Sequence, residues 1–199
     1  MLSTARRSGG FSLIELMVTI TLIGILMLLA VPAFGTWSAD ARVRSAAESL
    51  QSALRLAQSS AVARSRTSMF ALTSATPAYN ATPVTGGSSW YAILRPLSDS
   101  DEAYSSSSLI SSATVASQYG VTISGPALLC FSSLGQQTTA TYLGSICTAP
   151  TDDKPASYTL SRTGGARSLK VLVYLGGRVR MCDAAKTLSD TDPDGCPSP

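Results

Sequence analysis

The chain has 199 residues and a nearly balanced charge, with 15 Lys and Arg against 12 Asp and Glu, and it contains no histidine. Without histidine, a Ser-His-Asp triad, a Cys-His dyad and the commonest metal ligand are all excluded. The formal net charge of +3 means that any nucleic-acid binding must come from a local group of basic side chains, not from the protein as a whole.

The first predicted element is an apolar segment over residues 11–34, in which Glu15 is the only charged side chain. A helix of this length reaches roughly 36 Å, enough to cross a hydrocarbon core of about 30 Å. Because Arg6 and Arg7 precede the segment and no charge follows until Asp40, we expect a cytoplasmic N-terminus and an exported remainder. A cleaved signal peptide and a generic single-span anchor are the alternatives; the length of the segment and its carboxylate argue against the first.

Residues 10–15 read Gly-Phe-Ser-Leu-Ile-Glu and follow a short basic leader. This pattern resembles the class III signal of type IV prepilins. The resemblance implies that a prepilin peptidase removes residues 1–10 by cutting after Gly10, and that Phe11 becomes the N-methylated terminus. It also implies that Glu15 pairs with the terminal amine of a neighbouring pilin. A carboxylate that costs about 2.5–3.5 kcal/mol at a bilayer centre would then set the register between packed helices.

The helical pattern continues beyond the apolar segment. Gly24 and Pro32 match the glycine and proline usual in pilin helices, and Pro32 should kink the helix near the membrane exit because it lacks a backbone donor. Apolar residues then recur every three or four positions until the helix ends near Arg66. They are Val43, Ala47, Leu50, Leu54, Ala57 and Ala61. Because alanine lets a sheet approach closely, we expect this half to be the spine of a head; a solvated coiled-coil stalk is the alternative.

Seven short runs rich in β-branched and aromatic residues follow and are typical of strands. They cover residues 67–73, 90–94, 119–124, 128–131, 156–161, 168–174 and 178–182. Gly176-Gly177 between the last two runs predicts a hairpin. Residues 74–89 and 96–118 are expected to be poorly structured. The predicted fold class is α+β, with a long N-terminal helix packed on an antiparallel β-sheet head, and the head covers residues 35–199 and includes the amphipathic half of the helix.

Two groups of acidic residues have some likeness to calcium-binding loops. They are Asp99, Asp101 and Glu102 in the first group, and Asp190, Asp192 and Asp194 in the second. The first group has neither a fixed spacing nor a glycine, and the second lacks the downstream glutamate of an EF-hand. Both are therefore interpreted as solvated turns, and no metal and no cofactor is predicted.

The four cysteines are spaced too widely for a CxxC motif, and in an exported head they predict two disulfides, with free thiols as the alternative. Four cysteines allow three connectivities. Pairing of Cys130 with Cys147 and of Cys182 with Cys196 closes the shortest loops, each worth about 3 kcal/mol on the chain-entropy model. The resemblance to pilins, many of which have a disulfide-bounded C-terminal region, favours this sequential pairing.

Four stretches beyond the apolar segment narrow the resemblance to the GspH/FimT/FimU group of minor pilins and pseudopilins. They read LQSALRLAQSSAVARSRT, WYAIL, LLCFSSLGQ and SLKVLVYLGGRVRMC. The resemblance implies a non-catalytic, low-abundance subunit that primes or caps a type IV pilus or a type II secretion pseudopilus. Its partners would be other pilins, the prepilin peptidase and the inner membrane, with the head in the periplasm. An exported hydrolase is the least favoured function, because no nucleophile and base can be paired in the sequence.

Some FimT proteins bind DNA in natural transformation through a C-terminal Gly-Arg-x-Arg motif, which residues 177–180 match. On a strand, Arg178 and Arg180 would share one face, where their guanidiniums could span neighbouring phosphates. Residues 160–186 hold six basic side chains against one acidic. The alternative function is therefore binding of double-stranded DNA during DNA uptake. The simpler interpretation is that Arg178 and Arg180 lie on the solvent-exposed face of an ordinary strand.

Overall fold

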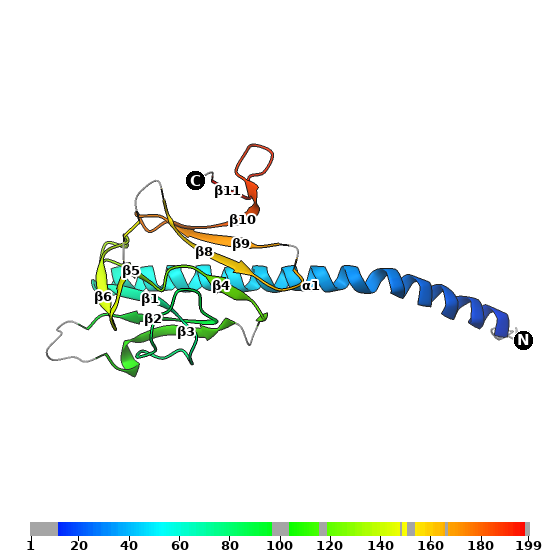
Figure 1. The fold of residues 1–199 in the computed structure, drawn as a ribbon, viewed down its shortest axis with the longest axis horizontal. Helices are drawn as coiled ribbons and strands as arrows, with labels where there is room; N and C mark the ends of the chain where they lie inside the picture. Colours follow the sequence, from blue (N-terminus) through cyan, green and yellow to red (C-terminus); the bar gives the residue numbers. More distant parts are fainter. Residues whose placement is uncertain are drawn as a thin grey trace, which may run out of the picture.

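The computed structural model describes residues 12–96, 104–115, 119–147, 149–150, 154–165 and 167–197, without the side chains of residues 29–33. Its longest element is the helix α1, Leu13–Arg64, of 52 residues. Figure 1 shows that the C-terminal half of α1 lies within the head, while the N-terminal half projects away from it and bends. The helix runs through Pro32 without interruption. A kink at this proline stays a prediction.

The helix ends at Arg64, two residues before the expected end. Ser65 adopts a left-handed conformation with φ of 50°, and the backbone N–H groups of Ser65 and Arg66 donate to the carbonyl oxygens of Val62 and Ala61. Such a cap satisfies carbonyl groups that the last helical turn leaves without partners.

Two antiparallel layers flank α1 (Figure 1). The first sheet has the order β3-β2-β1-β5. Its strands are β1 (Ser68–Thr73), β2 (Ser89–Leu94), β3 (Leu109–Thr114) and β5 (Leu128–Phe131), and all their pairings are antiparallel. The second sheet has the order β11-β10-β9-β8-β4. Its strands are β4 (Thr122–Ser124), β8 (Ala156–Ser161), β9 (Leu169–Val173), β10 (Val179–Thr187) and β11 (Gly195–Cys196). Only the pairing of β11 with β10 is parallel among these described strands.

Two smaller elements complete the head. A hairpin joins β6 (Ala140–Tyr142) to β7 (Ser145–Cys147), and a 3-10 helix, η1, covers Ser106–Ser108.

The alanine-rich stripe of α1 is fully buried, as the sequence predicts. Val43, Leu50 and Leu54 have no exposed surface, and the alanines between them let both sheets approach the helix. Phe70 of β1 and Tyr158 of β8 meet edge to face, with ring centroids 5.8 Å apart. The two sheets and the helix therefore share one core.

A second core lies on the far side of the first sheet and explains why every residue of β1 is buried. Phe70 and Leu72 face the helix, whereas Met69 and Ala71 face this second core. The disulfide between Cys130 of β5 and Cys147 of β7 lies in it, with Cα atoms 5.8 Å apart. The second disulfide joins Cys182 of β10 to Cys196 of β11, with Cα atoms 5.0 Å apart. The structure therefore has the sequential pairing, and none of the four cysteines is free.

The predicted fold of one long helix followed by antiparallel strands is confirmed, and the strands form two large sheets. One expectation is wrong. Within the stretch 96–118 that was expected to be unstructured, residues 106–114 form η1 and β3. The physical reason is that Ile110 and Ala113 pack on the core while the backbone of β3 pairs with β2. Asp99, Asp101 and Glu102 lie outside the described residues.

Candidate assembly and binding surfaces

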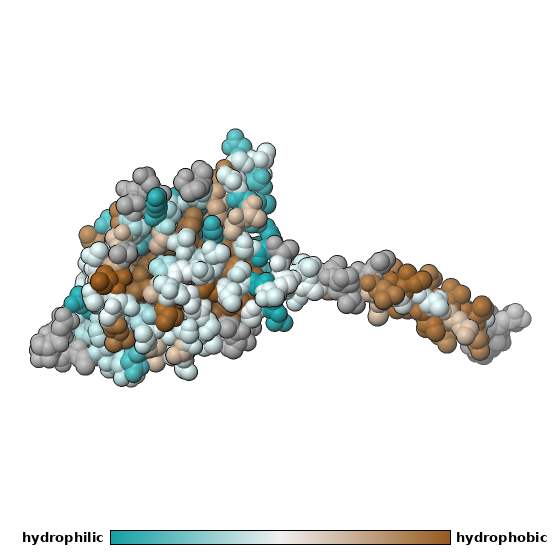
Figure 2. Space-filling view, in the orientation of Figure 1, coloured by the Kyte–Doolittle hydropathy of each residue, from teal (hydrophilic) through white to brown (hydrophobic). Residues whose placement is uncertain are grey.

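The N-terminal half of α1 exposes apolar side chains all around its circumference. These are Leu13, Ile14, Leu16, Met17, Val18, Ile20, Leu22, Ile23, Ile25, Leu26, Met27 and Leu28. Figure 2 shows them as a brown rod that stands clear of the head. A helix that is apolar on every side needs an apolar environment, either lipid or other helices. This segment therefore needs lipid or other helices around it, and it contributes nothing to the core of the head.

Glu15 interrupts this apolar surface in the first turn of α1 and is exposed. The first-turn backbone N–H groups of a helix point toward its N-terminus, so they favour a negative charge there. Gly10 and Phe11, the predicted cleavage and methylation positions, lie outside the described residues. The structure thus places the predicted assembly carboxylate at the far end of the projecting helix.

The described residues include no helix with a stretch that is long and apolar enough to cross a membrane. The expected segment 11–34 includes Phe11 and the side chains of residues 29–33, which the structure does not describe. The membrane segment stays a prediction.

A hollow of about 400 Å³ lies where α1 enters the head, and we call this region the neck. Residues of α1, of β9 and β10 and of the loops beside these strands line it: Trp37, Asp40, Ala41, Arg44, Arg167, Leu169, Met181, Cys182, Asp183 and Asp194. Trp37 is exposed and meets Phe34 edge to face, with ring centroids 6.4 Å apart. The neck therefore combines an exposed aromatic pair with a charged hollow.

Arg167 connects the three parts of the chain that meet at the neck. Its backbone N–H donates to Oδ1 of Asp40 in α1 at 3.0 Å. Its guanidinium donates to Oδ2 of Asp183 in β10 at 2.9 and 3.1 Å, and Nη2 lies 3.6 Å from Oδ2 of Asp194. Only 5% of the Asp183 side chain is exposed, and a buried carboxylate needs such a partner. Arg167 is thus a structural residue.

The loop between β10 and β11, residues 188–194, is acidic, and we call it the C-terminal loop. Basic side chains of the head hold it in place. Nζ of Lys186 lies 3.2 Å from Oδ1 of Asp192 and 3.1 Å from Oδ1 of Asp194. The hydrogen bond with Asp194 raises the pKa of Lys186, and the same bond lowers the pKa of Asp194. Within the described part of the chain, no three His, Cys, Asp or Glu side chains are arranged to hold a metal ion. Asp192 and Asp194 are therefore neutralised by the protein's own side chains.

Arg178 lies just before β10, in the turn that connects it to β9. The N–H of Gly177 donates to the oxygen of Tyr174 at 2.8 Å, and the N–H of Tyr174 donates to the oxygen of Arg178 at 3.0 Å. Gly177 has a φ of +82°, which this type of hairpin loop requires. The Cζ atom of Arg178 lies 4.2 Å from the centroid of the Tyr174 ring, a cation–π contact. Arg178 is exposed above this ring.

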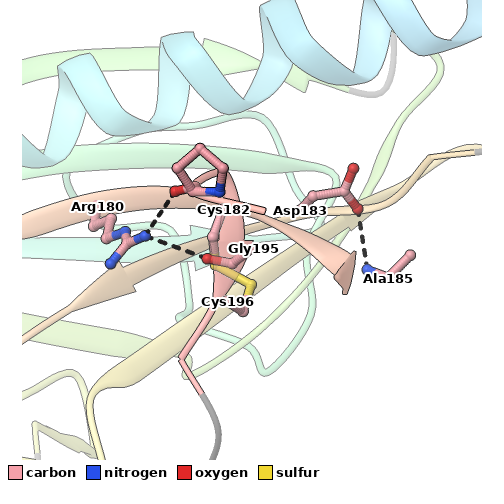
Figure 3. The surroundings of a disulfide bond; sticks show 7 residues. Arg180, Cys182, Asp183, Ala185, Gly195 and Cys196 are labelled. Carbon is pink, nitrogen blue, oxygen red and sulfur yellow. Dashed lines mark hydrogen bonds between the residues drawn. A yellow bond between two sulfur atoms is a disulfide. The ribbon is translucent and has the colours of Figure 1, made fainter. Parts of the chain in front are cut away.

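Arg180 has different surroundings. Its Nη2 donates to the carbonyl oxygens of Pro193 at 3.2 Å and Gly195 at 3.3 Å (Figure 3). Figure 3 shows this contact beside the disulfide of Cys182 with Cys196, so Arg180 helps to hold the C-terminal loop against β10. The two arginines of the motif therefore differ, because one is exposed on an aromatic ring and the other contacts the backbone.

The glycine of the same motif also has a packing role. A Cβ atom at Gly177 would overlap the carbonyl oxygen of Gly135 and the side-chain nitrogen of Gln58. Nε2 of Gln58 donates to that carbonyl at 2.8 Å, and Nε2 of Gln137 donates to the oxygen of Val173 at 2.8 Å. Sequence reasoning missed both glutamines, because nothing in their sequence neighbourhood marks them as the link between α1, the turn at Gly135 and the β9–β10 hairpin.

Most of the basic side chains in residues 160–186 contact other residues of the head. Arg162 donates to the oxygen of Tyr119 at 2.6 Å, and Arg167, Arg180 and Lys186 make the contacts given above. The compensating carboxylates of Asp192 and Asp194 lie outside the sequence window in which the surplus was counted. In the folded protein these two carboxylates therefore lie beside a basic side chain of residues 160–186, which a charge count along the sequence does not show.

Two family models match this chain. Residues 5–31 match the model of the prokaryotic N-terminal methylation motif, and residues 46–177 match the model of the type II transport protein GspH. Comparison with curated protein sequences gives no match. Two crystal structures of the type IV minor pilin FimU from Pseudomonas aeruginosa are similar, each at 17% identity. They cover 77% and 80% of this chain and 98% of their own, with TM-scores of 0.41 and 0.45.

The match to the GspH model spans more than half of the chain and includes the second half of α1, β1 to β9 and the turn at Gly177. The methylation motif covers the projecting half of the helix. The chain therefore belongs to the GspH family of minor pilins and pseudopilins.

Proposed function

We propose that this chain is a non-catalytic minor pilin or pseudopilin that primes or caps the assembly of a type IV pilus or a type II secretion pseudopilus. The observation that carries the proposal is the N-terminal half of α1, which leaves the head with exposed apolar side chains from Leu13 to Leu28. Such a surface is unfavourable in water and is stabilised by packing with the same segment of neighbouring subunits.

Before assembly, the same segment holds the protein in the inner membrane. Residues 1–10 are the leader that a prepilin peptidase removes, and Phe11 is then methylated; residues 11–34 cross the membrane. Residues 35–199 form the periplasmic head. An oxidising compartment fits the two disulfides, which persist in such compartments.

Glu15 is the proposed assembly carboxylate, which pairs with the terminal amine of the neighbouring subunit. The test is the variant Glu15→Ala in the full chain, produced together with its own assembly system. We expect normal amounts in the membrane fraction and a loss from sheared filaments, because the apolar anchor is intact while the charge that sets the register is gone.

Glu48→Ala is the matched control. Glu48 lies on the same helix and is exposed, but it pairs with Arg44 at 2.9 Å within the head. It should leave filament incorporation unchanged. Normal incorporation of the Glu15 variant would contradict the proposed role.

A second candidate function, binding of double-stranded DNA during DNA uptake, is favoured by one observation. Arg178 is exposed and lies over the Tyr174 ring, so its guanidinium is held in place and accessible to a phosphate. Arg180 is two residues away, and its Nη2 already donates to the C-terminal loop. Under this candidate, Arg178 makes the main contact.

Fluorescence anisotropy of the full chain in detergent with labelled duplex DNA tests this candidate. Arg178→Gln should weaken binding and reduce the slope of log K against log salt by about 0.9 for each phosphate that the arginine neutralises. Arg42→Gln, which removes an exposed arginine on α1, is the control. Equal affinity of parent and Arg178 variant at low salt would eliminate DNA binding through this motif.

A further inference from the structure

Phe34 and Trp37 form an exposed aromatic pair where the N-terminal half of α1 meets the head. Their exposed fractions are 67% and 69%, and their rings meet edge to face. The sequence has no charged residue between Glu15 and Asp40, so the pair lies at the boundary between the apolar and the charged part of α1. Tryptophan combines an apolar ring with one N–H donor, and for this reason it is enriched where a bilayer meets water.

The polar side chains of the N-terminal half of α1 are satisfied within the helix itself. The hydroxyl of Thr19 donates to the carbonyl oxygen of Leu16 at 2.8 Å, and that of Thr21 donates to the carbonyl oxygen of Val18 at 2.9 Å. Inside a bilayer a polar group has no water to bond with, so it must find its partner in the protein. Together with apolar side chains on every side, these bonds fit a helix that is surrounded by lipid.

The spacing of Glu15 and Trp37 matches the thickness of a bilayer. The two residues are 22 positions apart, which is about 33 Å along a straight helix. The hydrocarbon core of a bilayer is about 30 Å thick. When Trp37 lies at one boundary of this core, Glu15 therefore lies at the other and not at the centre, where a carboxylate is most costly.

The charges of the neck do not prevent the head from approaching a lipid surface. The aromatic pair adjoins the hollow of the neck, whose acidic side chains have partners within the head. Asp40 accepts a hydrogen bond from the backbone of Arg167, whose guanidinium pairs with Asp183. Asp194 pairs with Lys186 at 3.1 Å. The neck therefore brings no carboxylate without a cation or a donor to the membrane.

We propose that Phe34 and Trp37 lie in the headgroup layer on the periplasmic side of the inner membrane before assembly, so that the neck rests directly on lipid. The inference rests on the proposed function, in which residues 11–34 cross this membrane. It adds the depth at which they do so. The aromatic pair fixes how far α1 enters the bilayer, and it thereby holds Glu15 at the cytoplasmic boundary, where the terminal amine of Phe11 is formed.

The two tryptophans of the chain provide the probe and its control. Trp90 is 3% exposed in the core of the head, whereas Trp37 is exposed. The full chain is inserted into phosphatidylcholine vesicles that contain lipid brominated either near the headgroup or near the end of the acyl chains, because bromine quenches a tryptophan only on contact. Bromine near the headgroup should quench the emission more strongly. Trp37→Phe should abolish this quenching and leave the emission of Trp90, which also reports that the head is folded.

Two further variants calibrate the depth in the Trp37→Phe chain. Leu26→Trp places the probe midway between Glu15 and Trp37, 11 residues from each. It should be quenched most strongly by bromine near the end of the acyl chains. Leu56→Trp places the probe at an exposed position of α1 within the head. Neither brominated lipid should quench it.

The outcomes separate this inference from the proposed function. Quenching of the Leu26→Trp chain without quenching of Trp37 would overturn the inference and leave the membrane segment in place. Stronger quenching of Trp37 by bromine near the end of the acyl chains would also overturn it, because the tryptophan would then lie inside the hydrocarbon core. Absence of quenching in the Leu26→Trp chain would remove the membrane segment itself, and this inference with it.

Discussion

The guanidinium of Arg167 donates two hydrogen bonds to one carboxylate oxygen of Asp183, at 2.9 and 3.1 Å. Asp183 is buried, while about half of the Arg167 side chain is exposed. The contact joins the loop after β8 to β10, and the backbone of the same arginine is bound to Asp40 of α1. It therefore fixes the second sheet to the helix at the neck.

Arg167→Ala should destabilise the head by about 2–3 kcal/mol, because it leaves a buried carboxylate without its cation. The free energy of unfolding from urea titration measures this effect. Arg44→Ala removes an exposed ion pair with Glu48 and should cost less than about 1 kcal/mol. Equal, small effects of the two changes would contradict the structural role of Arg167.

Gly177→Ala should destabilise the protein by more than about 2 kcal/mol, since it combines a positive φ with overlap against Gly135 and Gln58. Gly176→Ala is the matched control, because a Cβ atom there meets nothing within 4 Å. It should change stability by no more than about 0.5 kcal/mol. Thermal melting of the two variants decides the point, and similar melting temperatures would count against the packing role of Gly177.

The ion pair of Lys186 with Asp194 predicts a pH window for the C-terminal loop. The pKa of Asp194 is lowered in the folded state, so its contribution is present above about pH 4 and is lost as pH falls through the folded pKa. The pKa of Lys186 is raised, so its contribution is present below about pH 10 and is lost as pH rises through the folded value.

Unfolding free energies of parent and Lys186→Gln measured from pH 2 to 11 test this window. The difference between the two proteins should be constant between about pH 5 and 9 and shrink at both extremes. A difference that does not change with pH would mean that Lys186 contributes by packing alone.

Two buried tyrosines should respond differently to removal of the hydroxyl group. Tyr158 is fully buried, its hydroxyl has no hydrogen-bond partner among the described residues, and burial raises its pKa far above the usual range. Tyr158→Phe should therefore be neutral or stabilising, by up to about 1 kcal/mol. The hydroxyl of Tyr91 donates to the oxygen of Ala81, so Tyr91→Phe should cost about 1 kcal/mol. The reverse order in urea titration would contradict this account.

Sequence reasoning succeeded where the pattern is local. The stripe from Val43 to Ala61 predicts the buried face of α1, because helix periodicity alone decides which side chains share a side. It failed where partners are distant in sequence. The strand β3 is rich in serine and forms because β2 pairs with it, and Gln58 shows its role only when Gly135 and Gly177 lie beside it.

The candidate site shows the same difference. The roles of Gly10, Phe11 and Glu15 are predicted from their local spacing alone, and they stay predictions. The surroundings of Arg180 could not be predicted from the sequence, because the carbonyl groups of Pro193 and Gly195 reach it through the loop that the disulfide of Cys182 with Cys196 closes.

The most direct test of the central claim is the mass of the N-terminal peptide of the protein purified from cells that contain its assembly system. The proposed function predicts a chain that begins at Phe11 and carries one additional methyl group on its terminal nitrogen. A chain that retains residues 1–10, or one that begins after the apolar segment as a cleaved signal peptide would leave it, would contradict the account.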